Sequence, residues 1–197
     1  LNYAQRLHSG LGMKLAVRIA TLGYAIPGMV LAVGILVLLT FVDRGVSGFL
    51  RDNFDGFSGL LITGSVACLV FVYVARFLTV AYNSGHMGMA ALHYNLDAAA
   101  RSLGASPRRV LQQIHFPLLR PALLSGLLLV FIDVMKELPA TLILRPFNFE
   151  TLSTRVYRLA ADERLSEAST AALSIIVLGL IPIALILLTT FDAKRSQ

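Results

Sequence analysis

The sequence contains little charge and almost no cysteine. Charged residues make up 14% of its 197 residues, hydrophobic residues make up 56%, and the mean hydropathy is +0.74. Soluble domains are about a quarter charged, so this composition argues against a soluble protein. The single cysteine, Cys68, lies in an apolar run, which excludes an intrachain disulfide and a multi-cysteine metal site and predicts a small buried side chain. We therefore predict an integral membrane protein.

The sequence also lacks the usual motifs of hydrolytic enzymes. It has no Gly-rich phosphate loop of the Walker type, no His-Glu-x-x-His and no Gly-x-Ser-x-Gly. His86, His93 and His115 lie close together in the sequence, but their spacing fits no common metal site, and we expect surface histidines. These absences predict a chain that is not an enzyme, carries no cofactor of its own and has no fixed metal site.

Four long apolar stretches occupy most of the chain. A helix needs about 20 apolar residues to cross a bilayer, and four stretches reach that length: residues 15–42, 59–80, 118–144 and 168–191. Residues 43–58 predict a loop or short surface helix, and residues 145–167 predict an amphipathic helix. Residues 1–14 are polar and basic and predict a short helix on the membrane surface. The expected fold is an all-α, polytopic transmembrane helix bundle with about four spans.

Basic residues are distributed unevenly between the connecting segments. The segments before the first span, between the second and third, and after the fourth, counted with the arginines at the adjoining span ends, hold ten basic residues and two acids. The other two connections hold six arginines and seven acids. Positively charged connections stay in the cytoplasm. The distribution predicts that both ends of the chain and the connection after the second span are cytoplasmic, with the helix of residues 145–167 on the outer side.

The connection of residues 95–117 is polar and predicts two short helices joined by a turn. Its first part favours a helix that ends at Gly104, since glycine readily adopts the positive φ that closes a helix. Ser106 then predicts an N-cap and Pro107 the first residue of a second helix, which Pro117 should end.

The second of these helices is basic and amphipathic. Helical spacing places Val110, Leu111 and Ile114 on one face, with Arg108 and Arg109 mostly off it. A basic helix-turn-helix could read DNA, but the apolar stretches on both sides place this one at a membrane surface and argue against nucleic acid as a partner. A purely structural loop is a second interpretation. The favoured interpretation is a surface that docks another protein.

The third apolar stretch contains Asp133, Lys136 and Glu137. A charge at the bilayer centre costs about 2.5–3.5 kcal/mol on insertion scales, so these side chains should face protein or water. Helical spacing predicts one charged face with an internal pair. Two interpretations stay open, an ion pair that ties helices together and a polar lining of a translocation path.

Two further residues interrupt the apolar stretches. Pro27 breaks the first stretch, which predicts either a packing kink or a lining of the same path. Arg76 lies near the end of the second stretch, where a long side chain is expected to reach the lipid headgroups.

The polar connection resembles the cytoplasmic coupling loop of bacterial ABC importer permeases. That loop has the pattern Glu-Ala-Ala, three residues, Gly, nine residues, Ile, one residue, Leu-Pro, and the residues in register with it are Ala99, Ala100, Gly104, Ile114 and Pro117.

This chain departs from the coupling-loop pattern at two positions. Ala98 stands in place of the glutamate, with Asp97 the nearest acid, and Phe116 replaces the leucine. The resemblance implies that the loop docks on a cytoplasmic ABC ATPase dimer through its two arginines and its apolar face. The missing glutamate removes one expected polar contact with that ATPase.

A second resemblance covers nearly the whole chain. Residues 136–157 hold the run Lys-Glu-Leu-Pro-Ala-Thr-Leu and several later matches to the C-terminal half of ferric iron permeases, and residues 23–28 resemble the same family. Those permeases are fused pairs of similar halves. The resemblance implies that residues 1–197 form a single partial permease domain, without the N-terminal spans and a whole preceding half.

The resemblance also implies a function. It predicts the membrane subunit of an ATP-driven importer of the bacterial inner membrane, which moves ferric iron from a periplasmic binding protein by alternating access. A second permease half is a further expected partner, and ATP and Mg²⁺ would bind the separate ATPase. Asp133 and Glu137 would offer transient oxygen ligands at most.

Other functions are compatible with parts of the sequence. Related permeases carry thiamine, phosphonates, sulfate or polyamines. A secondary transporter also uses broken helices but needs no ATPase. A membrane-embedded enzyme would need a convergent set of catalytic side chains.

Overall fold

The computed structural model describes residues 1–7, 10–53 and 61–195, and all regular structure in these ranges is helical. In chain order the helices are α1 (Asn2–Leu7), α2 (Leu11–Ala20), α3 (Gly28–Asn53), α4 (Val66–Ala90), α5 (Asn95–Ser102), α6 (Pro107–Val110), the π-helical turn η1 (Leu111–His115), α7 (Phe116–Met135), α8 (Pro139–Leu144), α9 (Leu152–Ala161) and α10 (Leu165–Arg195). Four segments of the described chain are long and apolar enough to cross a membrane: Gly28–Leu50, Val66–Ala90, Pro107–Met135 and Leu165–Ala184. The predicted all-α, four-span bundle is confirmed.

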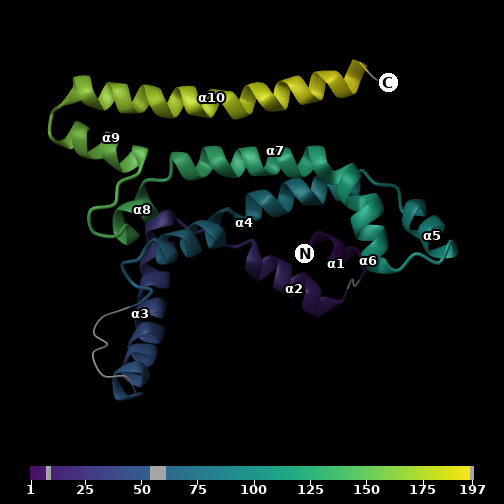
Figure 1. Ribbon diagram of the computed structural model, residues 1–197, viewed down its shortest axis with the longest axis horizontal. Helices are drawn as coiled ribbons and strands as arrows, with labels where there is room; N and C mark the ends of the chain where they lie inside the picture. Colours follow the sequence, from purple (N-terminus) through teal and green to yellow (C-terminus); the bar gives the residue numbers. More distant parts are fainter. Residues whose placement is uncertain (8–9, 54–60, 196–197) are drawn as a thin grey trace.

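Helices α4 and α7 lie side by side, and α10 runs along the other side of α7 (Figure 1). Small residues bring α4 and α7 together, because a Cβ added to Gly88 would lie 2.6 Å from the Ala122 Cβ, and one added to Gly126 would lie 2.7 Å from the Ser84 Cβ. Close contact of this kind drives helix association in lipid, where the hydrophobic effect between helices is absent. Large apolar side chains are exposed along all four spans, as expected of faces turned to lipid or to another membrane helix.

A second cluster of buried residues joins α3 to α4 and α8. It consists of Ala32, Cys68, Leu69, Val72, Ala140 and Leu144. Cys68 is fully buried there, so its predicted role as a small core side chain is confirmed.

The first span begins later than the sequence suggests. Helix α2 ends at Ala20, residues 21–27 are not helical, and α3 starts at Gly28 instead of continuing from residue 15. A residue that precedes proline is disfavoured in the helical conformation, which favours a break at Ile26, just before α3. The predicted kink is a complete break.

The predicted loop or short surface helix of residues 43–58 is, in its first part, a continuation of the first span. Helix α3 continues through residues 43–53, and residues 54–58 lie outside the described residues. Asp43 is fully buried, and its carboxylate accepts hydrogen bonds of 2.8–3.0 Å from the main-chain N–H groups of Leu61, Ile62 and Thr63. An acid that suggested a solvated loop therefore holds the chain just before α4. Of the predicted second span, residues 59–60 lie outside the described part, and α4 runs on to Ala90.

The third and fourth spans differ from prediction at their ends. The second helix of the polar connection does not stop at Pro117 but runs through η1 into α7, with Pro117 in its first turn and Pro121 inside it. The π-helical turn shifts the hydrogen-bond register just before Pro117, which lets the helix pass a residue without an N–H. Helix α7 ends at Met135 rather than at residue 144, and α8 follows as a separate short helix.

The chain ends in two antiparallel helices. The predicted amphipathic helix corresponds to α9, whose start is fixed by a capping box between Thr151 and Thr154. Helix α9 packs against α10 (Figure 1). Helix α10 extends beyond the predicted 168–191 at both ends and contains Pro182.

Candidate functional site

The polar connection forms the predicted turn at Gly104. Helix α5 ends with two hydrogen bonds, from the Gly104 N–H to the Arg101 carbonyl (2.9 Å) and from the Ala105 N–H to the Ala100 carbonyl (3.0 Å). Gly104 itself has a φ of +79°. This is a Schellman motif, in which the residue after the C-cap adopts the left-handed conformation that only glycine takes without strain. The prediction for Gly104 is confirmed.

The second helix starts where the sequence predicts. Ser106 takes the extended conformation of an N-cap residue, although its side chain makes no capping hydrogen bond, and Pro107 is the first helical residue. We call residues 95–110 the coupling loop, after the permease loop that they resemble. In Figure 1 its two helices, α5 and α6, project together from one end of the α4–α7 pair.

The exposed side of the coupling loop differs from the predicted apolar face. Val110 is 1% exposed and points into this chain, while Leu111 and Ile114 are only partly exposed. Leu103, next to the turn, is instead 88% exposed. A large apolar residue beside the helix-closing glycine is the signal that sequence reasoning missed.

The remaining predicted loop residues divide between the two sides. The exposed ones are Ala98, Ala99, Gly104, Arg108, Arg109 and Pro117. Ala100 and Asp97 are buried. The outer surface of the loop is therefore basic, with Leu103 at its tip.

Asp97 pairs with two residues inside the chain. Its Oδ2 lies 2.7 Å from the Arg6 Nε, and its Oδ1 lies 2.5 Å from the His115 Nε2. Burial raises the pKa of Asp97, but the hydrogen bond and charge of His115 and the charge of Arg6 outweigh it and leave that pKa below its usual value. His115 is fully buried, so the predicted surface location holds for His86 and His93 but is wrong for His115.

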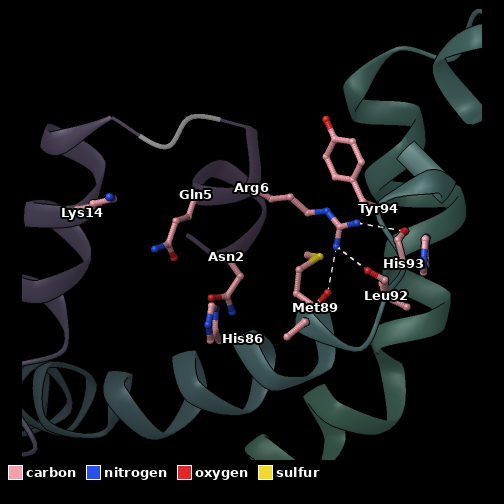
Figure 2. Close-up of a pocket in the computed structure, with 10 residues that line it drawn as sticks. Asn2, Gln5, Arg6, Lys14, His86, Met89, Leu92, His93 and Tyr94 are labelled. Atoms are coloured by element: carbon pink, nitrogen blue, oxygen red, sulfur yellow. Dashed lines mark hydrogen bonds between the residues drawn. The ribbon is translucent and has the colours of Figure 1, made fainter. Parts of the chain in front are cut away.

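Arg6 also binds the end of α4. Its Nη1 donates to the carbonyls of Met89 (3.0 Å) and Leu92 (3.2 Å), and its Nη2 donates to the carbonyl of His93 (3.3 Å). Figure 2 shows these bonds at one side of an open pocket of about 600 Å³, with Lys14 on the opposite side. The predicted surface helix of residues 1–14 is thus two helices, of which α1 is fastened to α4.

A second charged cluster lies within the membrane spans. Arg76 is the eleventh residue of α4, which places it about 15 Å from the start of that helix at 1.5 Å per residue. The prediction that its side chain reaches the lipid headgroups is therefore wrong. Its Nε lies 3.2 Å from the Glu137 Oε2, and its Nη1 donates to the Ile26 carbonyl at 2.9 Å. Both side chains are largely buried, 17% and 7% exposed. We call this arrangement the membrane joint.

The membrane joint connects two breaks in the helices. Ile26 belongs to the break before α3, and Glu137 to the break between α7 and α8. A Cβ added to Gly28 would lie 2.9 Å from the Glu137 Oε1 and 3.1 Å from the Arg76 Nη1, so the start of α3 packs directly on the pair. The sequence singled out Pro27 and Glu137 separately, and the fold brings these two breaks together through Arg76.

Hydrogen bonds hold Glu137 in this position. Its Oε1 accepts from the Ala140 N–H (3.1 Å), and its main-chain carbonyl accepts from the hydroxyls of Thr141 (2.8 Å) and Ser153 (2.9 Å). The Thr141 hydroxyl also contacts the Tyr73 hydroxyl at 2.5 Å. The carboxylate is therefore already engaged, and it orders the break rather than pointing into open space.

The predicted single charged face of the third span is only partly correct. Lys136 pairs with Asp133 at 2.8 Å, as expected, but Lys136 is 64% exposed. Glu137 does not join this pair. Helix α7 ends at Met135, and the Glu137 carboxylate is directed towards Arg76 instead. Within residues 1–7, 10–53 and 61–195, no three His, Cys, Asp or Glu side chains gather as a metal site.

The structure contains the helix–glycine–helix loop that the sequence resemblance predicted, and the family match places the chain in the class of ABC-type permeases. The family described as "Binding-protein-dependent transport system inner membrane component" matches residues 3–197. The chain is thus a component of an inner-membrane transport system, and the resemblance that its sequence suggested is confirmed.

Several relatives of known description are similar over most of the chain. One is the Fe(3+)-transport system permease protein FbpB 2 of Haemophilus influenzae, 27% identical over 86% of this chain and 30% of the relative. Another is the putative 2-aminoethylphosphonate transport system permease protein PhnV of Salmonella typhimurium, 31% identical over 87% of this chain and 57% of the relative. A third is the spermidine/putrescine transport system permease protein PotC of Haemophilus influenzae, 29% identical over 87% and 58%. The chain spans about a third to three fifths of the length of these relatives.

Proposed function

We propose that this chain is part of the membrane-spanning subunit of an ATP-driven importer, coupled through residues 95–110 to a cytoplasmic ABC ATPase dimer. ATP and Mg²⁺ would bind that ATPase, and a periplasmic binding protein and a second permease half would complete the assembly. The observation that carries this proposal is the shape of the coupling loop. Its turn at Gly104 projects an apolar tip and two exposed arginine side chains away from the bundle.

The physical properties of the loop fit a docking element. Leu103 is 88% exposed although it is large and apolar, which is unfavourable unless another surface covers it. Arg108 and Arg109 of α6 are exposed as well, and the Arg109 Nε donates to the Gln113 side chain at 2.9 Å. An apolar anchor with a basic rim is typical of the centre and edge of a protein interface.

Replacement of Gly104 tests the docking assignment. Gly104→Asp should leave the protein inserted in the membrane but release the ATPase, because aspartate is strained at a φ of +79° and adds an anion beside a basic surface. The measurement is the amount of ATPase that co-purifies in mild detergent. Ser102→Asp is the matched control for charge alone, and Gly104→Asn for conformation, since asparagine tolerates the left-handed region better. Full retention of the ATPase by Gly104→Asp would overturn the assignment.

We propose that the membrane joint lies on the translocation path. Pro27 and Glu137 mark two helix breaks that meet at the depth of Arg76, and non-helical backbone at membrane depth is tolerated where it is buried in protein or lines a cavity. Such breaks are the usual place of transporter binding sites. Asp133 and Lys136 would extend the polar surface outward from that point.

Ferric iron is the substrate that we propose, on the strength of the ferric relative. Both acids pair with a basic side chain, Glu137 with the largely buried Arg76 and Asp133 with Lys136, which is 64% exposed. The exposed pair opens more readily, so Asp133 is the better candidate for a transient contact with a cation. The relatives named for 2-aminoethylphosphonate and spermidine keep other small solutes open, as do the thiamine and sulfate carriers that the sequence suggested. Cells that express the complete transporter should take up labelled ferric iron, and uptake of labelled 2-aminoethylphosphonate or spermidine instead would replace this substrate.

We propose that both ends of the chain and the coupling loop face the cytoplasm, with α9 in the periplasm. The uneven distribution of basic residues supports this orientation. A cysteine in place of Ser106 should be labelled only from the cytoplasm, and one in place of Phe147, which is fully exposed, only from outside. The buried natural Cys68 gives little background. The reverse pattern would invert the orientation.

A further inference from the structure

Helix α1 lies between the end of α4 and the coupling loop and contacts both. Besides the Arg6 contacts, the Tyr3 hydroxyl donates to the Pro107 carbonyl at 2.8 Å, and the Asn2 amide donates to the Tyr82 carbonyl at 3.1 Å. The Tyr3 ring also lies against the His115 ring, 5.2 Å between centroids. The six residues of α1 therefore touch α4 and both helices of the loop.

Arg6 carries the central part of this connection. A guanidinium group has five N–H donors in a fixed plane, and Arg6 directs three nitrogens at four acceptors on two different elements. Three acceptors are carbonyls at and just after the last turn of α4; those of Met89 and His93 also accept main-chain N–H groups, from Leu92 and Leu96, at 3.2 Å each. The fourth is Asp97 of α5. One side chain thus fixes the start of the coupling loop against the end of a membrane span.

Asp97 extends the connection to the second helix of the loop. Its other oxygen contacts the His115 ring at 2.5 Å, and His115 is fully buried in η1, the turn that leads into α7. The chain of contacts therefore runs from α4 through Arg6 and Asp97 to α7. We call it the loop joint.

We propose that Arg6 is a positioning residue for energy coupling. It makes the coupling loop move as one body with the ends of α4 and α7, so that displacement of the loop by the ATPase reaches the membrane spans. This inference rests on the proposed docking of the loop on an ATPase. It adds that transmission depends on an arginine outside the loop, which does not touch the ATPase.

Hydrogen–deuterium exchange in the complete transporter tests the joint directly. Arg6→Gln should speed amide exchange over residues 95–107 about tenfold, within the range of interaction energies measured for contacting residues. Lys14→Gln is the matched control, because it removes a basic side chain of the same pocket that makes no hydrogen bond or ion pair with the described residues of the loop. Unchanged exchange in Arg6→Gln would overturn the proposal.

Coupling supplies the second readout. Arg6→Gln should retain the ATPase, because the exposed face of the loop is intact, but import about tenfold less labelled ferric citrate for each ATP hydrolysed. A normal ratio would refute the role in transmission. The failure of the two proposals can be told apart. A wild-type chain that retains no ATPase would refute the proposed function, whereas the exchange measurement tests the loop joint and does not require a bound ATPase.

Two further variants separate positioning from general destabilisation. Arg6→Lys keeps the charge opposite Asp97 and should restore at least part of the exchange protection and of the import ratio. The double variant Arg6→Gln/Asp97→Asn should be no worse than the stronger single variant if both residues act through one contact. The proposal would be overturned if the effects of the two single variants on exchange multiplied in the double variant. It would also be overturned if Arg6→Lys were as impaired as Arg6→Gln.

Discussion

The loop joint and the membrane joint are built in the same way in different surroundings. In each, an arginine binds main-chain carbonyls where a helix ends or breaks and pairs with a carboxylate from another element: Arg6 with Asp97, and Arg76 with Glu137. The loop joint lies at the end of α4 and the start of the third span, whereas the membrane joint lies midway along α4. A lost partner is therefore harder to replace with water at the membrane joint. The comparison teaches that this chain satisfies the polar groups of its broken helices with arginines, and that the cost of losing a partner depends on depth.

The largest expected effect follows from breaking the membrane joint. Glu137→Gln keeps the shape and one acceptor but leaves Arg76 as an unpaired buried charge, which costs about 3–5 kcal/mol. Denaturant unfolding in detergent micelles measures the loss. Asp97→Asn at the loop joint should cost less, about 1–3 kcal/mol.

A double variant gives the matched control for this prediction. Arg76→Met combined with Glu137→Gln removes both charges and should recover most of the stability, because an ion pair replaced by apolar packing is often neutral. If the single Glu137→Gln variant were as stable as the wild type, the membrane joint would not hold the breaks together. If the Glu137→Gln variant were stable but the transporter did not take up its substrate, Glu137 would act in the translocation path and not in stability.

An intermediate effect is expected from Gly28, which has no counterpart at the loop joint. Gly28→Val places methyl groups against the Glu137 carboxylate and the Arg76 guanidinium, already 2.9 Å and 3.1 Å from a single added Cβ. Overpacking of this kind costs about 1–3 kcal/mol. Gly34→Val is the control, since a Cβ there meets nothing within 4 Å. Equal stability of the two variants would show that α3 can shift away from the joint.

The smallest effect is expected from the exposed pair in the same segment. Lys136→Gln removes the contact with Asp133, but Lys136 is 64% exposed, and pairs of this kind contribute about 0–1 kcal/mol. The unfolding free energy should fall by less than about 0.5 kcal/mol. A loss comparable to that of Glu137→Gln would mean that sequence proximity, rather than burial, makes this segment important.

Local signals predicted the parts of the candidate site that local chemistry builds. Gly104, Ser106 and Pro107 specify a turn and a helix start within a few residues, and the structure has both where the sequence placed them. The ends of the helices were less predictable, because Pro117 is accommodated by a π-helical turn that no local pattern announced. Asp43 shows the same limit, since its partners lie about 20 residues away.

The sequence by itself determined that this is an all-helical membrane protein with four spans and a glycine-closed coupling loop. These features follow from hydropathy and from the φ preferences of glycine and proline, which act over a few residues. Tertiary structure decided which charges meet. Arg6 lies 91 residues from Asp97 in sequence, and Arg76 lies in α4 whereas Glu137 lies in the break between α7 and α8. Their pairing depends on how the helices pack, because a buried charge must be paired and only the tertiary fold determines which oppositely charged group lies close to it.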